Sequence, residues 1–144
     1  MAIERMDNVG IVVEDLDETI AFFTELGMEL EGRMVVEGDW AETAVGVRDM
    51  TCEIAMMKLP DGPGRLELCT YHSPDMVRPG PPVPNTVGFH RVMFAVHDLD
   101  DTIERLQALG GELLDGVGDY QGAIRICYLR GPSGVVIGLA DDVG

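Results

Sequence analysis

An internal repeat restricts what this chain can fold into. Residues 11–30 and residues 94–113 align at a fixed offset of 83, and ten of the twenty aligned positions are identical. The identical positions include the Asp-Leu-Asp segments that begin at Asp15 and Asp98, and the Leu-Gly pairs that end at Gly27 and Gly110. Such identity within a chain of 144 residues indicates two copies of one structural module.

Each copy has the residue pattern of a strand, a helix and three further strands. Alternating apolar residues predict a strand before each helix, and apolar residues at helical spacing predict helices that begin after Asp15 and Asp98. Gly27 and Gly110 stand where a helix ends in a left-handed residue. The further strands are predicted over 29–37, 52–59 and 65–71 in the first copy, and over 112–117, 123–130 and 134–140 in the second.

The repeat also predicts how the chain is divided. The first βαβββ module covers residues 1–71 and the second covers 89–144, and we expect them to form one compact domain. Residues 72–88 contain five of the eight prolines and are predicted to be a stiff linker. The segment 38–49, with the single tryptophan Trp40, is predicted to be an irregular loop or a short helix. The acidic pair at 141–142 is interpreted as a solvated tail.

Charge and composition exclude several classes of function. Hydrophobic residues make up 46% of the chain and charged residues 25%, which is typical of a globular protein. A net charge of −16 repels nucleic-acid phosphates and anionic lipids, and it suits either solubility or a cationic ligand. No apolar run reaches the roughly 20 residues that span a membrane, and no signal peptide is evident. Three cysteines without a CxxC spacing indicate a reducing compartment, so we predict a cytoplasmic protein.

The two modules resemble the vicinal oxygen chelate superfamily, which includes glyoxalase I, extradiol dioxygenases and bleomycin-resistance binding proteins. The resemblance rests on the paired βαβββ pattern, the two Asp-Leu-Asp helix starts, the Leu-Glu-Leu strand at 66–68 and the Pro-Ser-Gly turn at 132–134. It implies an α+β fold in which the two tandem modules form curved, cup-shaped mixed sheets that enclose a pocket. It also implies a homodimer. It does not imply one function, because this fold supports several chemistries as well as binding alone.

The resemblance further implies four metal-ligand positions, which are usually His, Glu, His and Glu. In this chain the residue seven before each helix-start aspartate is Asn8 in the first module and Arg91 in the second. The matching positions on the last strands are Glu67 and Gly138. Because only Glu67 is a good ligand for a divalent ion, we predict that the chain binds no metal and no other cofactor.

His90 is an alternative ligand near the start of the second module. It shares its strand face with Val92, and a shift of one residue turns a side chain to the opposite face. We therefore interpret His90 as structural, although a local bulge would allow a two-ligand site of Glu67 with His90. His72 and His97 are predicted to lie on the surface, in the linker and in a strand-to-helix turn.

Without a metal, the implied pocket would bind a small molecule directly. Glu67 and Arg91 would come from facing strands and could form a salt bridge in place of the ion. Gly138 has no side chain and would leave room for a ligand. The predicted ligand-binding residues are Asn8, Trp40, Glu67, Cys69, Tyr71, Arg91, Met93 and Gly138.

Two functions fit these residues. The first is a metal-free protein that sequesters a bulky natural product or antibiotic in a dimer cleft, as the bleomycin-resistance branch of the family implies. The second is an enzyme that acts on a small oxygenated substrate. It would be either a metal-assisted lyase, isomerase or epimerase resembling glyoxalase I, or a metal-free catalyst with Glu67 as general base and Arg91 stabilising an anion. Arg91 beside Glu67 would lower the pKa of the carboxyl group and weaken it as a base. The sequence therefore favours binding and leaves open whether the chain is an enzyme.

Overall fold

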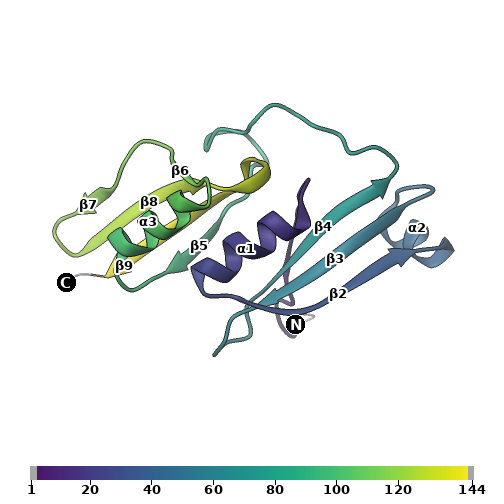
Figure 1. The fold of residues 1–144 in the computed structure, drawn as a ribbon, viewed down its shortest axis with the longest axis horizontal. Helices are drawn as coiled ribbons and strands as arrows, with labels where there is room; N and C mark the ends of the chain where they lie inside the picture. Colours follow the sequence, from purple (N-terminus) through teal and green to yellow (C-terminus); the bar gives the residue numbers. More distant parts are fainter. Residues whose placement is uncertain (1–2, 143–144) are drawn as a thin grey trace. The chain divides into compact units, whose positions relative to one another are not determined.

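The computed structural model describes residues 3–142 and divides the chain into two compact units, Met1–Arg78 and Pro79–Gly144. Each unit contains one mixed sheet and one long helix (Figure 1). The elements of unit 1 are β1 (Val9–Val12), α1 (Leu16–Leu26), β2 (Glu29–Glu37), α2 (Asp39–Val45), β3 (Thr51–Lys58) and β4 (Arg65–Ser73). The elements of unit 2 are β5 (Val92–Ala95), α3 (Leu99–Ala108), β6 (Glu112–Leu113), β7 (Gly118–Tyr120), β8 (Ile124–Arg130), a 3-10 turn (Pro132–Gly134) and β9 (Val136–Asp142).

The two sheets have the same topology, which confirms the predicted α+β fold. In unit 1 the strand order is β1-β4-β3-β2, with β1 parallel to β4 and the other pairs antiparallel. Unit 2 repeats this as β5-β9-β8-β6, with β5 parallel to β9 and with the short β7 also paired to β8. The strand predicted over 112–117 is only two residues long, because Asp115 and Gly116 are poor strand formers.

The long helices begin at the predicted aspartates. A side-chain oxygen of Asp15 accepts a hydrogen bond from the Glu18 amide at 3.0 Å, and one of Asp98 accepts from the Asp101 amide at 3.1 Å. These bonds satisfy amides that have no partner inside a helix. Gly27 and Gly110 have φ angles of +123° and +90°, as expected for residues that end a helix.

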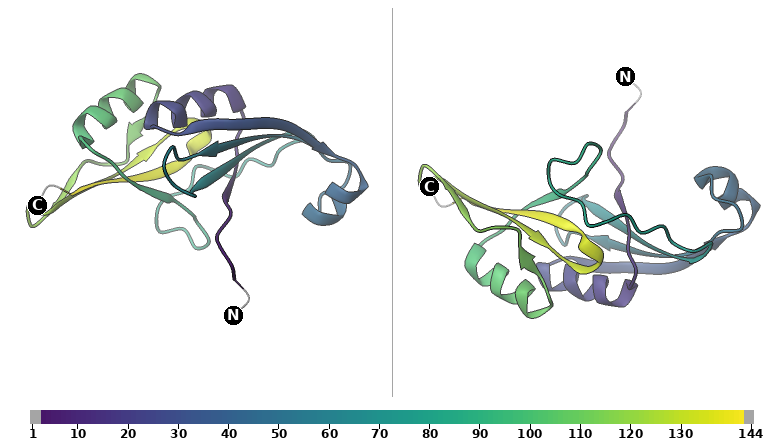
Figure 2. Two further views of the ribbon diagram at one scale, coloured as in Figure 1. Left: turned by 90° about the horizontal axis from the view of Figure 1, so that it is seen from below. Right: turned by 90° about the horizontal axis from the view of Figure 1, so that it is seen from above.

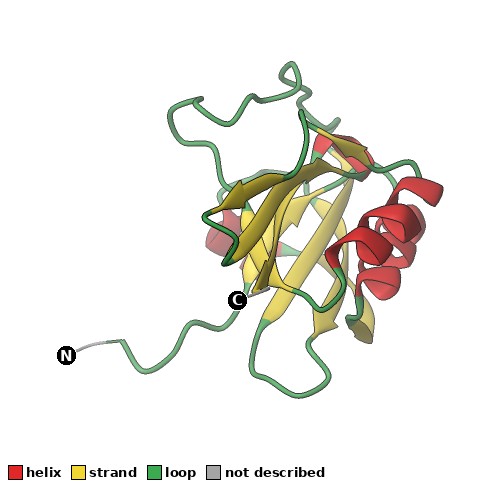
Figure 3. Cartoon of the chain, turned by 90° about the vertical axis from the view of Figure 1, so that its left-hand side faces the viewer, coloured by secondary structure: helices red, strands yellow, loops and turns green. Residues whose placement is uncertain are grey.

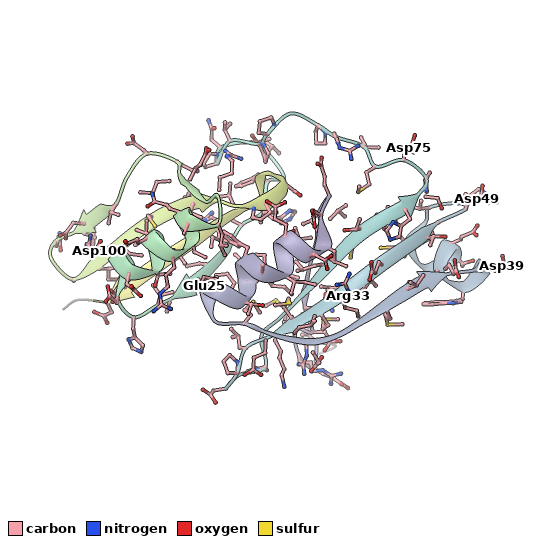
Figure 4. The ribbon with its side chains drawn as sticks, in the orientation of Figure 1. Glu25, Arg33, Asp39, Asp49, Asp75 and Asp100 are labelled. Carbon is pink, nitrogen blue, oxygen red and sulfur yellow. The ribbon has the colours of Figure 1, made fainter. Side chains whose placement is uncertain are left out.

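Each long helix covers one face of the sheet of its own unit (Figures 2 and 3). Phe22 and Phe23 of α1 are buried, and their rings pack edge to face with centroids 5.3 Å apart. Arg33 of β2 lies beside α1 (Figure 4). It pairs with Asp17 of the helix and with Glu53 of β3. The buried side chains of unit 2 include Leu99, Leu106, Leu129, Ile137 and Leu139. The opposite face of each sheet has no long helix over it, and we call it the open face.

One local expectation is confirmed and two need correction. The segment 38–49 contains the short helix α2, which is one of the two predicted alternatives. His72 lies within β4 rather than in a linker, with its Nε2 3.8 Å from Oε1 of Glu53. Asp141 is not part of a solvated tail, because its Oδ2 accepts a hydrogen bond from the Leu99 amide at the start of α3. Among residues 3–142, no helix is long and apolar enough to cross a membrane.

Candidate functional site

The open face of the unit 1 sheet is organised in rows of residues that lie opposite one another on neighbouring strands. Alternation along each strand places every second residue on this face. We call two adjacent rows of this face the carboxylate row and the apolar row. The carboxylate row consists of Gly32, Met56, Glu67 and Gly10, and the apolar row consists of Met34, Ile54, Cys69 and Val12.

Glu67 lies in the carboxylate row, whose two end residues are glycines. Its register partners are Met56 on β3 and Gly10 on β1, and Met56 in turn lies opposite Gly32 on β2. A Cβ atom on Gly10 or Gly32 would have no heavy atom within 4 Å, so both ends of the row are open space. Sγ of Cys69 donates to Oε1 of Glu67 over 3.7 Å.

The apolar row provides an exposed hydrophobic surface beside Glu67. Met34 is 59% exposed and Val12 is 56% exposed, which is unusual for apolar side chains on a sheet face. A cavity of about 280 Å³ lies over this part of the sheet. It is lined by Glu31, Gly32, Arg33, Met34, Ile54 and Met56.

One end of the open face is closed by the segment that contains α2. Val36, Ala41, Met50 and Cys52 form a buried cluster there, and Tyr71 packs against it. Cys69 and Ile54 of the apolar row also pack against this cluster, which fixes the position of the row. The covering segment therefore limits a ligand to the two open rows.

The other end of the open face carries ion pairs. Lys58 Nζ lies 3.9 Å from Glu29 Oε2, and the guanidinium of Arg65 donates to both carboxylate oxygens of Glu31 at 3.0 and 3.1 Å. Arg65 lowers the pKa of Glu31 through this hydrogen-bonded pair. Both cations are thus engaged, and within the described part of unit 1 no salt bridge includes Glu67.

The thiols of the open face are held in the protonated form. Burial and, to a smaller extent, the neighbouring Cys52 and Glu67 together raise the pKa of Cys69 to about 12. Burial is also the main cause of the raised pKa values of Cys52 and Tyr71. Because a thiolate and not a thiol is nucleophilic, Cys69 and Cys52 are unsuited to covalent catalysis at neutral pH.

The open face of unit 2 carries a cation on an aromatic ring. Arg91 directly precedes β5, and its guanidinium lies 4.6 Å from the centroid of the Tyr128 ring. Met93 and Tyr128 are the register partners of Gly138. Sδ and Cε of Met93 lie 2.7 Å from the place of a Cβ on Gly138, so Met93 fills the room that this glycine was expected to leave.

The structure places the predicted site residues as follows. Glu67, Cys69 and Tyr71 share the open face of unit 1, whereas Asn8 precedes β1 and is exposed. Trp40 lies on α2, is 65% exposed and is not part of the cluster beneath it. Arg91, Met93 and Gly138 belong to unit 2, so the Glu67–Arg91 salt bridge stays a prediction.

Sequence reasoning predicted Glu67 and Cys69 but missed the other six residues of the open rows. Cross-strand register brings these six to Glu67 and Cys69: Gly10, Val12, Gly32, Met34, Ile54 and Met56. The period of two along each strand was a usable signal for the face they share. Which strands are neighbours, and in which register, could not be counted along the chain.

The residues at the four family ligand positions do not fit a divalent metal ion. Asn8 offers an amide, Glu67 a carboxylate, Arg91 a cation and Gly138 no side chain. Throughout residues 3–142, no group of three or more His, Cys, Asp or Glu side chains could hold a metal ion. His90 lies before β5 and is exposed, and it does not complete such a group.

Comparisons with known proteins agree with this architecture. The sequence model of the Glyoxalase/Bleomycin resistance protein/Dioxygenase superfamily matches residues 5–139. A solved glyoxalase family protein from Bacillus cereus is 46% identical, with a TM-score of 0.93 over 100% of this chain and 99% of that one. An antibiotic-binding protein from Streptomyces sp. CB03234 shares the fold, with a TM-score of 0.63 and 21% identity over 99% of this chain and 98% of its own.

A curated relative is an enzyme. A 2-epi-5-epi-valiolone epimerase from Actinomyces sp. is 38% identical over 109 residues, which make up 72% of this chain. The matched region covers 58% of the length of that epimerase.

Proposed function

The chain belongs to the Glyoxalase/Bleomycin resistance protein/Dioxygenase superfamily, and we propose that it is a metal-free protein that binds a small organic molecule. The proposed ligand, a natural product or antibiotic, lies on the open face of the unit 1 sheet. The observation that supports this proposal is the pair of open rows, which join exposed apolar side chains to a single carboxylate. At the four family ligand positions, only Glu67 is a good ligand for a divalent ion, whereas metal-assisted chemistry needs at least three such ligands.

The surface is suited to binding for physical reasons. Its cavity of about 280 Å³ is close to the lower end of the range, about 300–1,000 Å³, in which small-molecule sites lie. Met34 and Met56 have flexible, polarisable side chains that adapt to the shape of a ligand. Covering exposed apolar surface stabilises a complex by roughly 25 cal/mol per Å².

Metal analysis tests the metal-free part of the proposal. Protein purified without chelator should contain far less than one zinc, nickel, iron or manganese ion per chain by elemental analysis. One equivalent of metal that is lost in Glu67→Gln would contradict the proposal. A thermal-shift screen with aromatic natural products then identifies ligands, and the recovered ligand should be chemically unchanged.

An epimerase is the second candidate function, because a relative with 38% identity carries that activity. Glu67 is the only carboxylate in the two open rows and would be the base that removes a proton. Incubation with 2-epi-5-epi-valiolone, followed by proton NMR, tests this function. An epimer that forms with the wild type and not with Glu67→Gln would establish the enzyme over the binding protein. A homodimer and a cytoplasmic location stay predictions.

A further inference from the structure

We propose that the ligand of the unit 1 open face is an organic cation, with an apolar or aromatic body over the apolar row and an ammonium group paired with Glu67. The inference rests on the proposed function and names the chemical class of its ligand. Three features of the face support this ligand class: the charge of Glu67, the groups around it, and the space beside it.

Glu67 differs from three neighbouring carboxylates of the same sheet. Glu29, Glu31 and Glu53 each have a cationic partner, namely Lys58, Arg65 and Arg33, and the more distant Glu37 accepts a hydrogen bond from the Thr51 hydroxyl. Within the described part of unit 1, the Glu67 side chain is hydrogen-bonded to the weak donor Cys69. A carboxylate that a bound ligand removes from water needs an opposite charge, because an unpaired buried charge is costly.

The cations nearest Glu67 on the open face already have partners. Lys58 pairs with Glu29, and Arg65 pairs with Glu31. The thiols of Cys69 and Cys52 and the phenol of Tyr71 are neutral at pH 7, because their pKa values are raised. The negative charge of Glu67 contributes to each of these shifts. With a net charge of −16, the whole chain also attracts cations and repels anions during encounter.

The space beside Glu67 matches a flat body with an amine at one end. Gly32 and Gly10 leave both ends of the carboxylate row free of side chains, and neither has a positive φ angle. The cavity over Met34, Ile54 and Met56 lies next to Glu67, because Met56 is its register partner. A ring over these apolar side chains would therefore place a short aminomethyl arm near the carboxylate.

A series of three naphthalene compounds tests the inference. 1-Naphthylmethylamine, 1-naphthalenemethanol and 1-naphthoate have the same ring system and carry a positive, zero and negative charge at pH 7. Binding is measured by calorimetric or fluorescence titration. We expect the amine to bind at least tenfold more tightly than the alcohol, a difference of about 1.4 kcal/mol, and the naphthoate to bind most weakly.

Three variants assign this preference to the site. In Glu67→Gln the amine should lose its tenfold advantage while the alcohol binds as it does to the wild type. Asp61→Asn removes one negative charge from an exposed turn and should leave all three affinities unchanged. Gly32→Val fills open space in the carboxylate row and should weaken all three compounds; its Cβ would have no heavy atom within 4 Å, and an unchanged melting temperature checks that the variant folds.

The possible results separate the inference from the proposed function. If the alcohol or the naphthoate binds as tightly as the amine, and Gly32→Val weakens all three, the organic-cation class is wrong and the binding face stands. A salt bridge between Arg91 and Glu67 would neutralise the carboxylate and remove the preference for the amine in the same way. If Gly32→Val leaves every affinity unchanged, or if no compound binds saturably, the binding face itself is wrong.

Discussion

The thiol of Cys69 should react very slowly with disulfide reagents in the native protein. Its pKa is raised from 9.0 to about 12 by burial and by the nearby Cys52 and Glu67. At pH 8 the thiolate fraction then falls from about 10% to about 0.01%, a decrease of roughly 1,000-fold. Each thiolate is more nucleophilic at the higher pKa, with a Brønsted coefficient of about 0.4–0.5, so the net rate should fall roughly 30- to 60-fold. Limited access to the half-buried side chain slows the reaction further.

The assay follows modification of each cysteine separately. The protein is treated with 2,2′-dithiodipyridine at pH 8, quenched with acid and digested, and the cysteine peptides are quantified by mass spectrometry. The reference is the same thiol in protein unfolded by urea at the same pH. Native Cys69 should react at least about 30-fold more slowly than this reference.

Substitution of Glu67 tests the cause of the slow reaction. Glu67→Gln removes a negative charge and the carboxylate that accepts from the thiol, so the pKa of Cys69 should fall and its rate should rise. Cys127 lies in unit 2 and should keep its rate, which makes it an internal control. Rapid modification of Cys69 in the native wild type, within about threefold of the unfolded rate, would refute this description of the open face.

Three further predictions concern stability. The free energy of unfolding should decrease as pH rises from about 9 to 12, because the folded state keeps the Cys69 proton that the unfolded chain releases. Urea melts across this pH range check the sign, and a flat profile would contradict the prediction. Asp141→Ala should lower the unfolding free energy by about 1 kcal/mol, because the Leu99 amide loses its cap; an unchanged melting temperature would mean that the bond contributes nothing. Gly111→Ala should lower the free energy of unfolding by about 1–3 kcal/mol, because its Cβ would lie 2.8 Å from a carbonyl oxygen of α3. In the same urea titration the control Gly116→Ala should be nearly neutral, because its Cβ meets open space.

Local patterns in the sequence predicted much of the fold. The repeat placed both modules, and the aspartates at 15 and 98 begin the two long helices as expected. Alternation along β4 correctly placed Glu67, Cys69 and Tyr71 on one face, because the period of two is a property of a single strand. These features depend on neighbouring residues and can therefore be derived along the chain.

Features that depend on distant residues were not predicted. The side chain of Met93 fills the space at Gly138, and Asp141 caps α3 from more than forty residues away along the chain. The glycines at the ends of the carboxylate row became part of the candidate site only through pairing of β1 with β4 and β2 with β3. Sequence periodicity gives the face of a residue but not its cross-strand partner, so these contacts need the structure.

Methionine-methyl NMR is the most direct test of the central claim that the open face of unit 1 binds the ligand. Of the nine methionines, Met34 and Met56 lie on the two open rows, while Met57 is fully buried on the helix-covered face. Protein labelled with ¹³C at the methionine methyls is titrated with 1-naphthylmethylamine, and the signals are assigned with single Met→Leu variants. We expect saturable chemical-shift changes of the Met34 and Met56 methyls and little change at Met57. Shifts confined to Met93 or other methionines, with Met34 and Met56 unchanged at saturation, would contradict it.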